Sequence, residues 1–114
     1  MPRLNTFKVT IETGDQGTPG PVLFNFNNHT LPFENVKGGT AAGQTFEGEF
    51  EVNSFAHSLT LVGPEQGEWR LEKITVDYKC ESLKPYAVTF DALTLDAANQ
   101  VNIWQDPPLP SFAV

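Results

Sequence analysis

The sequence predicts an all-β protein, an antiparallel β-sandwich of about seven to eight strands. Several short segments alternate apolar and polar residues with a period of two, which is typical of strands with one buried face. Clusters of Gly, Pro and Asn separate these segments and mark turns. No segment shows the 3.6-residue spacing of an amphipathic helix. A small closed β-barrel is the alternative.

The first part of the chain contains two predicted strands and a loop. Residues 7–12 and 22–26 are the strands, and a turn rich in Gly and Pro lies between them. Residues 31–33 form at most an edge segment, because Pro32 lacks a backbone donor. Residues 35–44 are predicted to be a loop, since their small residues offer no apolar face.

The clearest alternation lies in residues 45–52. Phe46, Phe50 and Val52 are predicted to face the core, while three glutamates form a solvated outer row. Gly48 interrupts the apolar face, which indicates a close approach of the backbone beneath a neighbouring aromatic ring. Residues 58–62 form the next strand, and residues 63–67 are predicted to be a hairpin-like link into the strand that follows.

Residues 68–78 form the strand around which the fold is organised. The apolar residues Trp69 and Leu71 occupy odd positions. The apolar residues that follow, Ile74, Val76 and Tyr78, occupy even positions. Because a slip of one residue would send the apolar set to solvent, we predict a bulge across Glu72 and Lys73. Trp69 is the predicted structural anchor of the core.

The last part of the chain is predicted to be a long strand and a short one. Within residues 86–95 the large apolar residues occupy even positions before Asp91 and odd positions after Ala92. We therefore predict that the strand bends or bulges at these two residues, which is its switch point. Residues 101–104 form a final short strand. From about residue 106 a Pro-rich tail ends the single domain, residues 1–114.

Several of these segments resemble PLAT/LH2 domains, the β-sandwich modules of lipoxygenases, lipases and polycystins. Gly67-Glu68-Trp69 followed by LEKITV resembles the signature strand of that family. FKVTIETGD at residues 7–15 resembles its first strand and turn, and residues 45–52 and 58–63 resemble its central pair. The match covers about residues 7–78, and the family's Gly-Thr-Asp-Ala-Asn segment is absent after Gly17. The resemblance implies a PLAT/C2-like sandwich.

Composition limits the partners. The net charge of −7 argues against nucleic acid and against electrostatic docking on anionic lipid. We therefore expect any lipid binding to be apolar or bridged by a cation. No apolar run is long enough to be a transmembrane segment, and no signal peptide is evident, which predicts a cytoplasmic protein unless a leader has been removed. Oligomeric state stays open.

The sequence contains no recognised catalytic motif, and we expect no enzymatic activity. His29 and His57 stand in predicted turns without a nucleophile of suitable spacing, so a surface or cap role is expected for each. Cys80 is expected to be a small residue at the edge of the core.

One metal site and one set of contact residues are candidates. The resemblance to PLAT domains implies that Asp15, in the Thr-Gly-Asp turn, could be a calcium ligand, whereas a turn-fixing role is the alternative; no other cofactor is expected. Phe33, Phe55 and Trp104 lie near turns or the tail and are candidate interaction residues.

Three functions remain open. The first is a non-enzymatic, PLAT-like binding module that contacts protein or membrane lipid through loop residues. The second is a small structural or accessory subunit that docks on a larger protein or self-associates. The third is a small enzyme or ligand-binding sandwich with an apolar cavity.

Overall fold

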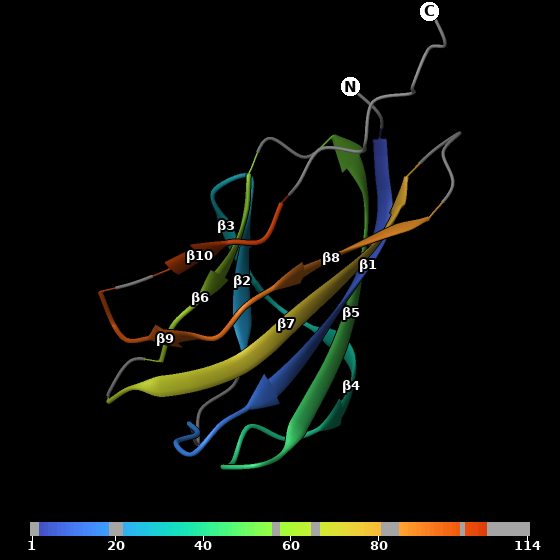
Figure 1. The fold of residues 1–114 in the computed structure, drawn as a ribbon. Coiled ribbons are helices and arrows are strands. Elements are labelled where there is room, and N and C mark those ends of the chain that lie inside the picture. Colours follow the sequence, from blue (N-terminus) through green and yellow to red (C-terminus); the bar gives the residue numbers. More distant parts are fainter. Residues whose placement is uncertain are drawn as a thin grey trace, which may run out of the picture.

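Strands make up all the regular structure in the part of the chain that a computed structural model describes, residues 3–18, 22–55, 58–64, 67–80, 85–98 and 100–104. Ten strands are present there: β1 (Arg3–Thr13), β2 (Leu23–Phe26), β3 (His29–Pro32), β4 (Glu34–Gly38), β5 (Thr45–Phe55), β6 (Leu59–Val62), β7 (Trp69–Cys80), β8 (Tyr86–Phe90), β9 (Leu93–Leu95) and β10 (Gln100–Asn102). They form two antiparallel sheets that pack as a sandwich (Figure 1). The predicted fold class is therefore confirmed, and the described strands do not close into the alternative barrel.

The larger sheet has six strands, in the order β4-β5-β1-β7-β8, with β9 paired to β7 beyond the end of β8. The smaller sheet has four strands, in the order β10-β6-β2-β3. β1 is central in the larger sheet, where Val9 faces Gly48 of β5 on one side and Val76 of β7 on the other. The strands that flank β1 are thus far from it in sequence.

Trp69 is buried at the start of β7, as predicted. Its side chain is 1% exposed, and its ring N–H donates a 3.0 Å hydrogen bond to Oγ1 of Thr13, which is itself buried. Buried indole N–H groups usually have a hydrogen-bond partner of this kind. The bond joins the end of β1 to the start of β7.

The predicted bulge in β7 is confirmed. Glu12 of β1 faces Lys73, whereas the next residue, Thr13, faces Leu71, so Glu72 is the extra residue on β7. On the other side of β7, β8 ends at Phe90 and β9 begins at Leu93, so two residues separate them. The switch predicted at Asp91 and Ala92 therefore lies opposite the bulge.

The predicted approach at Gly48 is also confirmed. A Cβ atom added to Gly48 would lie 2.8 Å from both Cβ and Cγ of Phe33, which is too close for any side chain. The covering ring is Phe33, which also packs on Phe24 and Phe46 with ring centroids 4.7 and 5.7 Å away. Aromatic rings fill this side of the core at the separations that such pairs favour.

Two predictions about connections are wrong. The link after β6 is not a hairpin, because β6 pairs with β2 and β10 while β7 belongs to the other sheet. The fully buried Leu59 and Leu61 of β6 need an opposing sheet as well as a neighbour, and turn residues alone do not say which strand pairs with which.

The predicted loop at residues 35–44 begins with a strand. β4 pairs with β5, although all five of its residues are exposed. A strand at the edge of a sheet needs only backbone hydrogen bonds, so the missing apolar face was no argument against it.

Side-chain amides and hydroxyls join the two sheets. Asn27, at the turn between β2 and β3, donates from Nδ2 to the Phe55 carbonyl at 2.8 Å and accepts at Oδ1 from the Ser58 amide at 3.0 Å. Elsewhere the Tyr78 hydroxyl of β7 donates to the carbonyl of Ile103, just after β10. No helix in the described ranges is long and apolar enough to span a membrane. The predicted tail lies outside the described residues.

Candidate functional site

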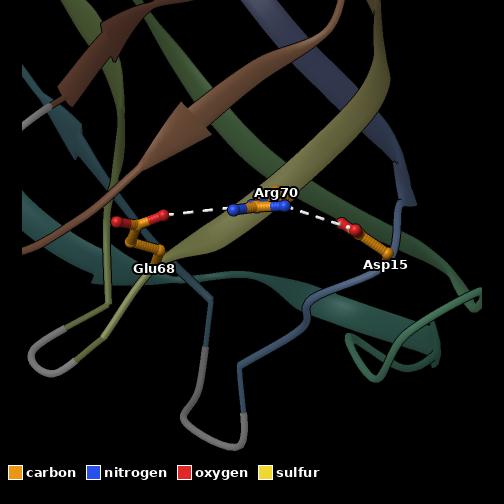
Figure 2. Close-up of polar contacts among 3 residues, drawn as sticks. All are labelled: Asp15, Glu68 and Arg70. Carbon is orange, nitrogen blue, oxygen red and sulfur yellow. Dashed lines mark hydrogen bonds and ion pairs between the residues drawn. The ribbon is translucent and has the colours of Figure 1, made fainter.

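The turn after β1 is hydrogen-bonded to the start of β7. The Gly14 amide donates to the Arg70 carbonyl at 2.8 Å, and the Arg70 amide donates to the Gln16 carbonyl at 2.9 Å. Two acidic side chains flank the guanidinium: Asp15 Oδ2 lies 3.3 Å from Nη1, and Glu68 Oε2 lies 3.9 Å from Nε (Figure 2). Gly14, Asp15 and Arg70 border an open groove of about 490 Å³ that extends to β9.

This turn fits calcium poorly. Asp15 already faces a cationic guanidinium, and calcium requires several oxygen ligands. Within the described ranges no three His, Cys, Asp or Glu residues are grouped so that they could hold a metal ion. The Asp15 calcium site stays a prediction that the arrangement does not favour. The pair itself is exposed, so it contributes little to stability.

The three candidate contact aromatics lie in different environments. Phe33 is 7% exposed and lies in the core, so its burial does not favour a contact role, which needs an exposed side chain, and that role stays a prediction. Phe55, at the end of β5, is 50% exposed and does meet that description. Trp104 is half-buried and packs edge-on against Tyr78, with ring centroids 5.3 Å apart. Of the two histidines, His29 is exposed on β3, and His57 lies outside the described residues.

The edges of the two sheets offer a different candidate surface. Two edge strands belong to the small sheet: β3 contains Pro32, which cannot donate, and β10 has only three residues. At one edge of the large sheet, β4 carries Glu34 and Lys37, and Asn35 has a positive φ of 51° where the register with β5 shifts. Charge, proline, shortness and bulges all discourage pairing with another chain.

The edge formed by β8 has none of these features. Its five residues, Tyr86, Ala87, Val88, Thr89 and Phe90, are uncharged and pair with β7 without a register shift. No second strand pairs with β8 within the described ranges. In Figure 1, β8 lies beside β7 at the boundary of the large sheet. We call residues 87–90 the β8 edge.

The side chains of β8 alternate in exposure. Tyr86, Val88 and Phe90 are half-buried against the core, whereas Ala87 and Thr89 are exposed on the outer face of the sheet. The Tyr86 ring packs on Tyr78 with centroids 4.9 Å apart. β8 therefore has a partly buried apolar inner face together with small side chains on its outer face.

Sequence reasoning predicted the strand but not its place at an edge. The signal in the sequence was the run of five uncharged residues, which by itself also fits an interior strand. Only the pairing of β7 with β1 on one side and β8 on the other shows that this run borders the sheet.

No family model, curated protein or solved structure matches the chain. The sandwich architecture is established by the strand pairing of the two sheets. Membership of the PLAT/LH2 family stays a prediction based on the quoted motifs.

Proposed function

We propose that this chain is a non-enzymatic protein-interaction module whose β8 edge accepts an extended strand from a protein partner. The observation that carries the proposal is the character of that edge, which is uncharged, continuous in register and without proline. Strand addition is a recurring way in which proteins recognise extended segments.

The backbone supplies the affinity in this mode of binding. In an antiparallel pair, alternate residues direct their N–H and C=O groups to one neighbour, and the residues between them direct theirs to the other side. Alternate residues of the β8 edge therefore present their backbone groups away from β7. A partner strand would bond to these groups while its side chains contact the half-buried Val88 and Phe90.

Peptide binding followed by amide chemical shifts tests the proposal. The probe is a capped peptide of sequence YAVTF, and we expect shift changes at residues 87–90 and at their β7 partners, residues 74–77. The matched control is the same peptide N-methylated at alternate residues, which keeps the side chains but loses backbone donors. We expect the control not to bind. Equal binding of both peptides, or binding of neither, would overturn the proposal.

A second candidate function, contact with a membrane, is favoured by one observation. Phe55 is a large apolar side chain that is 50% exposed at the end of β5. Because the net charge is −7, such contact would be apolar and not electrostatic. Sedimentation with neutral phosphatidylcholine vesicles tests it: we expect binding that resists salt and is lost in Phe55→Ser. Binding only to anionic vesicles, falling with salt, would contradict it.

A further inference from the structure

The β8 edge is self-complementary, and this points to its occupant. We propose that the partner strand is β8 of a second copy of this chain, paired antiparallel about Val88 so that the two large sheets become continuous. The inference rests on the proposed function, since it names the partner of the same edge.

The argument begins with the order of residues in β8. Reading outward from Val88 in either direction gives a small residue and then an aromatic one: Ala87 and Tyr86 on one side, Thr89 and Phe90 on the other. In an antiparallel pair centred on Val88, each aromatic residue faces an aromatic residue of the second copy, and each small residue faces a small one. A two-fold symmetric interface requires this self-complementarity, and cross-strand aromatic pairs stabilise sheets.

The inner face of the edge gives a second reason. Val88 and Phe90 are half-buried, because each packs against the core on one side only. A second β8 strand would cover the remaining apolar surface of both copies. Burial of apolar surface and the new backbone bonds therefore act together.

The charges around the edge permit this register. β8 contains no charged residue, and the nearest acid along the chain, Asp91, would face Pro85 of the second copy and not another acid.

The two whole molecules repel each other, because each carries a net charge of −7. Salt screens that repulsion, so we expect the dimer to strengthen with ionic strength. The contact is short compared with stable interfaces, so the dimer is weak and concentration-dependent.

Two double variants of the full chain test the register, because Ala87 faces Thr89 of the second copy. Ala87→Lys with Thr89→Glu places two opposite-charge pairs across the interface. Ala87→Lys with Thr89→Lys places two like-charge pairs there. Both variants put a lysine opposite Asp77 of β7, so they differ only at position 89.

Sedimentation equilibrium over a range of concentrations measures the outcome. We expect the first variant to dimerise about tenfold more tightly than the second. The change in net charge acts in the opposite direction, because the first variant stays at −7 while the second, which gains two positive charges, moves to −5. Urea melts of both variants check that each is folded.

The possible outcomes separate this inference from the proposed function. Dimers of equal strength in the two variants would mean that another surface joins the copies, which overturns the inference. A monomeric wild type at millimolar concentration also overturns it, and if the YAVTF peptide still binds at the β8 edge, the proposed function stands with a different protein as partner. Failure of both experiments overturns both.

Discussion

The two edge strands of the large sheet, β4 and β8, differ in how strongly their sequences discourage pairing with another chain. β4 and β8 each pair with one neighbour, yet β4 is charged and irregular whereas β8 is uncharged and regular. Between Glu34 and Lys37 the register of β4 shifts, and Asn35 adopts a positive φ. Five consecutive pairs join β8 to β7 without a shift. Since both strands belong to one sheet, the difference lies in their sequences and not in the architecture.

The surroundings of the two edges reinforce the difference. Beside β4, the outer face of β5 is acidic, and Glu47 pairs with Lys8 of β1 at 3.7 Å. The exposed outer residues of β8 are Ala87 and Thr89, which carry no charge. Protection against pairing is therefore concentrated on the β4 side.

The largest expected effect concerns the sheet on which both edges depend. Trp69→Ala removes a buried indole and its bond to Thr13, and we expect the free energy of unfolding to fall by about 3 kcal/mol or more. Urea titration measures the loss. Trp69→Phe, which keeps a ring but loses the donor, should lose less. A midpoint near that of the wild type for Trp69→Ala would show that the sheet is not anchored there.

The second-largest expected effect on stability concerns the core packing beneath β5, the strand that pairs with β4. Gly48→Ala places a methyl group against the Phe33 ring, and we expect a loss of about 1–3 kcal/mol in unfolding free energy. The matched control is Thr89→Ala on the exposed face of β8, which should stay within about 0.5 kcal/mol of the wild type. Equal losses for the two variants would contradict the difference described here.

Two single variants test the comparison directly: one adds a charge to β8, and the other removes a charge from β4. Thr89→Lys adds to β8 the kind of residue that protects β4, and we expect slower aggregation on warming with a stability change within about 0.5 kcal/mol. Lys37→Thr removes the charge from β4 but leaves the register shift and Asn35, so a smaller change in aggregation rate is expected. Light scattering during a temperature ramp measures both rates. A larger effect from Lys37→Thr would reverse our ranking of the edges.

The smallest effect concerns Cys80, the last residue of β7. Burial raises the pKa of its thiol above the ordinary value of 9.0, and a hydrogen bond with Tyr86 of β8 offsets part of that rise. The folded state therefore holds the proton more tightly than the unfolded state. Stability should fall slightly as the pH rises above 9, because only the unfolded chain then loses the proton readily.

Alkylation of Cys80 at pH 8 provides the measurement. We expect iodoacetamide to react more slowly with the folded chain than with the chain in urea, since the thiolate is the reactive form. If a second copy covers the β8 edge, the rate should fall further as protein concentration rises. Equal rates in the folded and unfolded chains would show that the thiol is accessible.

Most individual strands could be predicted from the sequence because alternation reports burial directly. The core positions of Trp69, Ile74 and Phe46, the bulge at Glu72, and the approach at Gly48 all followed from parity or from a missing side chain. Each of these features is local, so a single stretch of sequence carries the information.

Pairing between strands could not be predicted in the same way. β6 and β7 are consecutive and close in sequence, yet they lie in different sheets, and nothing in residues 63–67 states this. β4 was missed because an edge strand can be stabilised by backbone bonds alone. Phe33 was a candidate contact residue because it lies near a turn, and the sequence did not show that its ring covers Gly48 of β5. The candidate edge was missed for the same reason, since an edge is defined by which neighbours are present.

The central place of β1 has a consequence for synthesis of the chain. β1 ends at Thr13, but its partners β5 and β7 end only at Phe55 and Cys80. At about 5–20 residues per second, several seconds pass between translation of β1 and of its second partner. Throughout that interval the apolar side chains of β1 have no complete sheet to join. The large sheet can therefore be completed only after β7 has been translated, and a chaperone that holds nascent β1 would act before that sheet is complete.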